Sequence, residues 1–112
     1  MGSATNTMTF PGFERCVEFI RSDSQAVHED GYFWLIDRAH RHVDELIKLA
    51  FEEEDDFVRV TWVELLGETR SCDAIPTLKR MLNDHNRTVR NYAAESLKKL
   101  SLSDNGGCGE VI

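Results

Sequence analysis

The residues that could perform chemistry in this chain are an aspartate–histidine cluster, three cysteines and a run of acids. Asp37, His40 and Asp44 are spaced three and four residues apart, so on one helix they would share a face that a metal ion could use. No HExxH motif or cysteine accompanies them, and arginines occupy the same face. A solvated helix face is therefore the preferred interpretation, and no metal is expected.

The cysteines give little support for catalysis. Cys16, Cys72 and Cys108 are widely spaced, and no CxxC pair occurs. A cysteine beside a histidine could act as a nucleophile with its base, but no local context places such a pair. Free thiols in a reducing cytosol are the expectation, so the predicted localisation is cytoplasmic.

Five acids in a row, residues 52–56, form the densest charge in the chain. General acid–base catalysis needs two carboxyl groups in different environments, whereas five adjacent solvated carboxylates share one environment. Asp55 or Asp56 can instead cap a following helix. The glycine cluster at 106–109 follows the last helical pattern and does not precede a helix, so it does not form a phosphate cradle. We therefore expect no enzyme activity and no cofactor.

Apolar residues recur at helical spacing along most of the chain. Helices are expected over residues 12–22, 33–53, 56–67, 71–82 and 87–100. The segment 25–32 is open between a short helix and a loop, because Gly31 weakens a helix there. Phe33 and Trp34 are expected in the core.

The chain of 112 residues fits one domain with a packed core. That domain is expected over residues 10–102, between a disordered N-terminus, 1–9, and a flexible tail, 103–112. No stretch approaches the roughly 18 apolar residues that a membrane span needs. The N-terminus also lacks the pattern of a secretory signal.

The net charge of −7 is distributed unevenly. Residues 1–68 contain 15 acidic and 6 basic side chains, a net charge of −9, while residues 69–112 contain 5 and 7, a net charge of +2. Such a surface repels nucleic-acid backbones and attracts basic proteins. Nucleic-acid binding by the basic residues of the last helices is a further reading, resting on Lys79, Arg80, Arg87, Lys98 and Lys99.

A segment of the chain is repeated 31 residues later. The offset pairs Val58 with Val89, Arg59 with Arg90, Glu64 with Glu95, and Leu66 with Leu97. A fixed period of this length indicates stacked helical repeats. The two matching arginines are expected to bond a carboxylate or carbonyl across the interface between repeats.

These repeated residues resemble a known family. Residues 44–100 are similar to the short bacterial form of the HEAT-like repeat, through Ala74-Ile75-Pro76-x-Leu78, Leu82-x-Asp84 and Val89-Arg90-x-x-Ala93-Ala94-x-x-Leu97-x-x-Leu100. The resemblance implies an all-α fold, a short right-handed solenoid of about five helices in antiparallel pairs, whose second helices line a concave face. Trp62 departs from the pattern, because the family usually has a small residue there, and its indole is expected to fill a gap.

The resemblance and the negative charge together predict a non-enzymatic protein-binding module. Small acidic HEAT-like proteins look like immunity proteins, so the sharpest hypothesis is an inhibitor that covers the active site of a basic, nuclease-type bacterial toxin with carboxylates. A scaffold or lyase-accessory adaptor in a multiprotein complex is the alternative. Neither hypothesis involves nucleic acid, a membrane or a small-molecule substrate.

The predicted interface is one continuous acidic strip on the concave side. Its residues are Glu29, Asp30, Tyr32, Asp55, Asp56, Thr61, Glu64, Glu68, Tyr92 and Glu95. The acidic side chains would attract a basic partner, and the tyrosines would contact its arginines.

Overall fold

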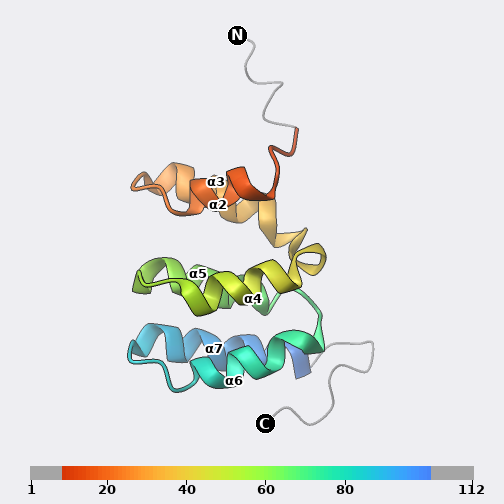
Figure 1. Cartoon of the computed structure of the whole chain (residues 1–112), viewed down its shortest axis with the longest axis vertical. Coiled ribbons are helices and arrows are strands. Elements are labelled where there is room, and N and C mark those ends of the chain that lie inside the picture. The colour runs from red at the N-terminus through yellow and green to blue at the C-terminus, as the bar shows by residue number, and fades with distance from the viewer. Residues whose placement is uncertain (1–8, 102–112) are drawn as a thin grey trace. The chain divides into compact units, whose positions relative to one another are not determined.

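The described part of the chain is all-helical. A computed structural model describes residues 9–101, within which there are six α-helices, two 3-10 helices and no strand (Figure 1). In chain order these are α2 Phe13–Ile20, α3 Gln25–Ile36, η1 Ala39–Arg41, α4 Val43–Glu52, α5 Asp56–Leu66, η2 Cys72–Ala74, α6 Ile75–Met81 and α7 Arg87–Ser101. The predicted all-α class is confirmed. The predicted terminal segments 1–9 and 103–112 lie, apart from Thr9, outside the described residues.

The chain divides into two compact units, Met1–Leu35 and Ile36–Ile112, within the region predicted as one domain. In the first unit α2 packs against α3 at Gly31. A Cβ atom at that position would lie 2.7 Å from the carbonyl oxygen of Cys16 and 2.8 Å from Cβ of Phe19, so only glycine allows this approach. The segment 25–32, left open between helix and loop, lies within helix α3. Its glycine allows α2 and α3 to pack closely.

The predicted single helix over 33–53 is wrong. Helix α3 ends at Ile36, α4 begins at Val43, and η1 lies between them. Leu35, Ala39 and Leu46 are buried on both sides of the break, so the apolar periodicity continues although the helix does not. Phe33 is 72% exposed, which corrects its expected place in the core. Trp34 is half-buried and its ring centroid lies 5.8 Å from that of Phe10.

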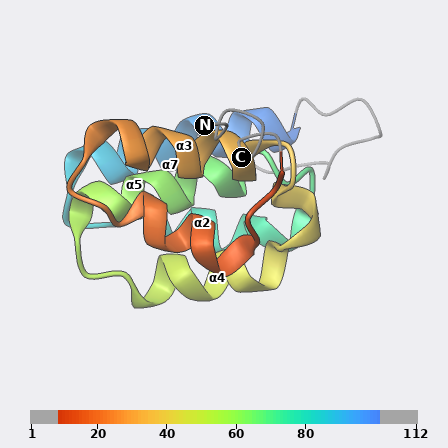
Figure 2. The same ribbon diagram turned by 90° about the horizontal axis from the view of Figure 1, so that it is seen from above.

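The second unit contains two helix pairs, α4–α5 and α6–α7 (Figures 1 and 2). Helix α5 packs against α7 and α4 against α6, so the pairs stack in register. The apolar residues that recur at helical spacing along α5 and α7 are buried in the core of this unit: Val58, Trp62, Leu65, Leu66, Val89, Ala93, Leu97 and Leu100. Burying each large apolar side chain contributes roughly 1.5–3 kcal/mol.

The stacked pairs approach each other closely at Gly67 and Ser96. A Cβ atom on Gly67 would lie 2.7 Å from Cβ and 2.9 Å from Cα of Ser96. The Ser96 hydroxyl donates a hydrogen bond of 2.9 Å to the carbonyl of Val63. This bond satisfies a buried hydroxyl and fixes the separation of α5 and α7.

The capping hydrogen bonds at the helix N-termini recur with the 31-residue period of the repeat. The Asp55 side chain caps α5 by accepting from the Val58 N–H at 3.1 Å, and Asn86 caps α7 by accepting from Val89 at 3.1 Å. In the first unit the Ser24 hydroxyl accepts from the Val27 N–H at 3.3 Å. Successive capping residues, and the residues that they cap, are 31 positions apart, so the start of α3 keeps the spacing of the repeat.

Two further observations concern the environment of the chain. Cys16 is a free, buried cysteine, whereas Cys72 is disulfide-bonded, so the expectation of free thiols is wrong at Cys72. Cys108 lies outside the described residues. Of the helices that are described, none combines the length and the apolar character needed to cross a membrane.

Candidate functional site

The candidate site is the side of α5 and α7 that does not pack on α4 or α6, here termed the α5–α7 face. Val60, Glu64 and Glu68 are spaced four residues apart along α5 and its C-terminal end, and all three are half-buried. Their equivalents 31 residues on, Asn91, Glu95 and Lys99, are exposed on α7. An ion pair between Lys99 and Glu68 joins the two rows. Phe57 and Tyr92, 61% and 38% exposed, complete the face.

The structure corrects one predicted residue of this face. Glu64, Glu68, Tyr92 and Glu95 are accessible, but Thr61 is only 4% exposed. Position 61 lies about 60° around the helix from Glu64, which turns it toward the core. Val60 takes the accessible position, and it makes the face less polar than predicted.

Asp55 and Asp56 have structural roles at the start of α5. Asp55 is the N-cap of the helix. Asp56 forms an ion pair with Arg59, accepts a hydrogen bond of 3.2 Å from the Asn86 amide, and lies 3.0 Å from Nε2 of His85. The carboxylates that a partner could use without breaking these contacts therefore lie elsewhere.

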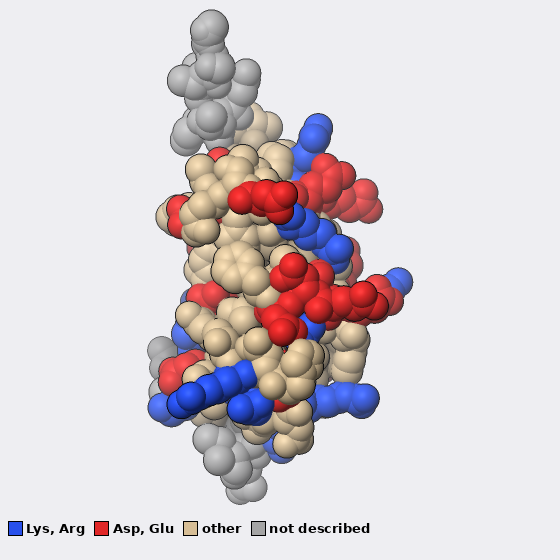
Figure 3. All heavy atoms as spheres, turned by 90° about the vertical axis from the view of Figure 1, so that its left-hand side faces the viewer, with Lys and Arg blue, Asp and Glu red and all other residues tan. Residues whose placement is uncertain are grey.

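The acidic turn between α4 and α5 is also partly structural. Glu53 accepts hydrogen bonds from the Trp62 indole at 3.0 Å and from the Asp55 N–H at 3.2 Å. Glu52 and Glu54 are exposed, and neither has a hydrogen bond or ion pair among the described residues. Figure 3 shows carboxylates gathered at the edge of the molecule where this turn lies.

Arg59 holds the two stacked pairs together. Its Nε and Nη2 atoms donate to the two carboxylate oxygens of Asp84 at 3.0 and 3.1 Å, and Nη1 donates to the Glu53 carbonyl at 2.7 Å. The side chains of Arg59 and Asp84 are only 6% and 11% exposed. Burial raises the pKa of Asp84, but the hydrogen bonds and charge of Arg59 outweigh it, so this pKa lies below its usual value.

Arg90 makes only half of these contacts. Its Nη1 atom donates to the carbonyls of Asp84 and His85 at 2.8 and 3.2 Å, as Arg59 does to Glu53, 31 residues earlier. No carboxylate of the described residues pairs with it. The predicted bond across the repeat interface is confirmed for Arg59, and it is wrong for Arg90, whose contacts lie within its own repeat.

One group of potential metal ligands occurs in the described part of the chain, and it does not suit a metal. Asp56, Asp84 and His85 place ligand atoms within 4.8 Å of one another. The guanidinium of Arg59 already bonds both carboxylates and supplies the positive charge that a cation would bring. The earlier candidates Asp37, His40 and Asp44 are not on one helix, since the first follows α3, the second is in η1 and the third is in α4.

The remaining predicted residues belong to the first unit. Glu29 and Asp30 are exposed on α3, and Tyr32 is half-buried. The Gln25 amide donates to the Glu29 carboxylate at 2.8 Å. Their continuity with the α5–α7 face stays a prediction.

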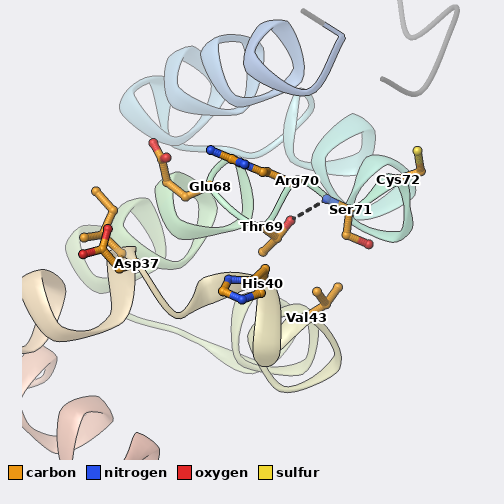
Figure 4. Close-up of a pocket in the computed structure, with 9 residues that line it drawn as sticks. Asp37, His40, Val43, Glu68, Thr69, Arg70, Ser71 and Cys72 are labelled. Carbon is orange, nitrogen blue, oxygen red and sulfur yellow. Dashed lines mark hydrogen bonds between the residues drawn. The ribbon is translucent and has the colours of Figure 1, made fainter. Parts of the chain in front are cut away.

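Sequence reasoning missed a polar cavity of about 830 Å³ in the second unit (Figure 4). It is lined by Ile36, Asp37, His40, Val43, Glu68, Thr69, Arg70, Ser71 and Cys72. The residues come from two segments that are far apart in the sequence, 36–43 and 68–72. Asp37 and His40 were considered as part of a possible metal-binding helix face, but no pattern in the sequence predicts that they lie near Arg70.

The stacked helix pairs, the register of their contacts and the exposed α5–α7 face define a helical-repeat scaffold. A family model described as HEAT repeats matches residues 34–105, more than half of the chain. The chain therefore belongs to the HEAT repeat family, and its fold is a short solenoid of helices. The comparison with curated proteins finds no match. HEAT repeats generally act as non-enzymatic scaffolds for protein interaction.

Proposed function

We propose that this chain is a binding module that holds a basic segment of a protein partner on the α5–α7 face. The observation that carries the proposal is that Glu64 and Glu95 lie at equivalent positions of two stacked helices, on a face that also contains the exposed rings of Phe57 and Tyr92. Carboxylates bind arginine and lysine side chains, and neighbouring aromatic rings can stack on guanidinium groups. The excess of acids over residues 1–68 would speed the encounter.

The specific form of this proposal is an immunity-type inhibitor of a basic, nuclease-type toxin. A nuclease site is built for phosphates, and a row of carboxylates can occupy it without any chemistry by the inhibitor. The gene for such a protein should lie directly beside a toxin gene, and its deletion should be lethal only when the toxin is present. Survival of the deletion strain while the neighbouring gene is expressed would exclude this form.

Membership of the HEAT repeat family also supports the second candidate, a scaffold or adaptor in a multiprotein complex. There the α5–α7 face would hold one subunit beside another. Co-purification of a stable complex with two or more other proteins would favour the adaptor, while a one-to-one complex with one basic protein would favour the inhibitor.

A labelled hexa-arginine peptide tests the face before a partner is known. Reversing the charge in the double variant Glu64→Lys/Glu95→Lys should weaken peptide binding by about tenfold or more and reduce its salt dependence. The matched control is Asp44→Lys/Asp73→Lys, which changes the net charge equally at exposed positions outside the face. Circular dichroism should show the same helix content in both. Equal weakening by both variants would mean that net charge alone attracts the peptide, and the proposed face would be wrong.

A further inference from the structure

The polar cavity beside η1 contains opposite charges that the fold leaves unpaired. Asp37, His40 and Arg70 line it as exposed residues, and none of their three side chains has a hydrogen bond or ion pair among the described residues. Glu68 also lines the cavity, but Lys99 neutralises its carboxylate. The groups of the lining that have no protein partner within residues 9–101 are therefore one carboxylate, one guanidinium and one imidazole, and each is open to solvent.

The backbone at Arg70 supports a role beyond folding. Its φ of 58° is the one positive φ at a non-glycine residue within 9–101. Holding such a residue in the left-handed region costs on the order of 1 kcal/mol, and strain of this kind is often found at binding sites. No described contact of the guanidinium compensates for that cost.

The arrangement of the cavity separates the two charges. In Figure 4 Asp37 lies at one side of the hollow and Ser71 at the other, with Arg70 and His40 between them on opposite walls. Asp37 and Arg70 do not pair with each other although they line the same cavity. Its volume of about 830 Å³ is within the range of small-ligand sites, roughly 300–1,000 Å³.

We propose that this cavity binds a ligand that carries both a carboxylate and a cationic ammonium or guanidinium group. The ligand carboxylate would accept bidentate hydrogen bonds from the Arg70 guanidinium, and the cationic group would form an ion pair with Asp37. A singly charged ligand would satisfy one of these groups and leave the other unpaired. The proposal goes beyond protein binding by the α5–α7 face and does not depend on it.

The test uses amide resonances of the full chain in NMR titrations. The probe 6-aminohexanoate carries both charges, and hexanoate and hexylamine carry one each. We expect 6-aminohexanoate to shift the amides of His40, Thr69 and Arg70 in a saturable manner, and each singly charged analogue to bind at least about fivefold more weakly. Equal binding of hexanoate, or the absence of a saturable shift at these amides with any doubly charged probe, would overturn the proposal.

Two conservative variants test the assigned residues. Asp37→Asn and Arg70→Gln should each weaken 6-aminohexanoate by at least about fivefold, and Gln keeps a non-glycine side chain at the strained position. Asp44→Asn and Arg87→Gln are matched controls at exposed positions without hydrogen bonds or ion pairs, and should bind like the wild type. Equal losses in the variants and the controls would contradict the assignment.

A blocked peptide, acetyl-Glu-Ala-Ala-Ala-Lys-amide, distinguishes the source of the ligand. It presents the same two charges on side chains, without free termini. Saturable shifts with the peptide but not with 6-aminohexanoate would identify a protein partner, and the reverse result would identify a free small molecule.

Discussion

Helices α5 and α7 occupy equivalent places in successive repeats, yet their equivalent arginines differ. Arg59 is buried and uses three nitrogen atoms, two of them on Asp84 of the next pair. Arg90 is half-buried and bonds only carbonyls of its own repeat. The difference shows that one repeated residue can serve two contacts. The carbonyl contact belongs to the repeat itself, while the carboxylate contact requires a following repeat.

The same distinction holds at another pair of equivalent positions. Gly67 follows α5 and allows Ser96 to approach, whereas its equivalent 31 residues on is Lys98, which is exposed on α7. A lysine in place of this glycine does not permit a similar approach by a further helix. Lys98 therefore places an exposed charged side chain on α7 at the position where α5 is followed by the small residue that close packing needs.

The largest expected effect comes from removing the arginine that has both contacts. Arg59→Ala should lower the free energy of unfolding by about 3 kcal/mol, because it leaves the mostly buried Asp84 carboxylate without its partner. Arg90→Ala removes only carbonyl contacts and should cost about 1 kcal/mol. Urea denaturation of both variants measures the difference. Equal losses would mean that the Arg59–Asp84 pair adds little beyond the carbonyl contact.

A smaller effect is expected at the glycine contact. Gly67→Ala should lower the free energy of unfolding by about 2 kcal/mol, because the added Cβ would meet both the side chain and the backbone of Ser96 and force α7 to move. Lys98→Ala at the equivalent position should change it by less than about 0.5 kcal/mol. Thermal unfolding followed by circular dichroism provides the comparison. A neutral Gly67→Ala would show that the stacked pairs separate at little cost.

Local signals in the sequence predicted most of the helices. The caps at Asp55 and Asn86 and the apolar spacing of α5 and α7 depend on neighbouring residues, and these elements were placed correctly. The break after α3 was missed because buried residues continue on the same period through it. The matching cap at the start of α3 is hard to recognise in the sequence, because Ser24 replaces the carboxylate or amide of the other two caps and Gly31 is unfavourable in an isolated helix.

The candidate site was harder to predict because it depends on contacts between distant segments. Sequence spacing placed Glu64 and Glu95 on equivalent turns. It could not show that the Asp56 carboxylate already contacts Arg59, Asn86 and His85. An error of one residue in helical phase placed Thr61 on the surface in place of Val60. The cavity at Arg70 needs the loop after α5 to approach η1, and no periodicity encodes that approach.

The last prediction concerns how the free energy of unfolding depends on pH. The Arg59–Asp84 contact should weaken in acid, whereas the carbonyl contacts of Arg90 contain no group that titrates. Asp84 has a pKa below its ordinary value of 3.8 when folded, because the hydrogen bonds and charge of Arg59 outweigh burial. A carboxyl group whose pKa falls on folding contributes stability that is complete above the unfolded pKa and is lost as pH drops through the folded pKa. The free energy of unfolding should therefore decrease on acidification below about pH 4.

The variant Asp84→Asn isolates this contribution. It should already be less stable than the wild type at pH 7, and should lose less further stability between pH 4 and the acid limit, since the titrating carboxylate is gone. A residual slope is expected, because the pKa of Asp56 is also lowered: the hydrogen bonds from Arg59 and Asn86 exceed the effect of burial. Asp44→Asn, at an exposed residue without hydrogen bonds, should follow the wild-type curve. Urea midpoints measured at intervals from pH 7 to pH 2.5 give the dependence of stability on pH. If the midpoint of Asp84→Asn fell with pH as steeply as that of the wild type, the acid response would arise outside the contact that joins the repeats, and the assignment would be wrong.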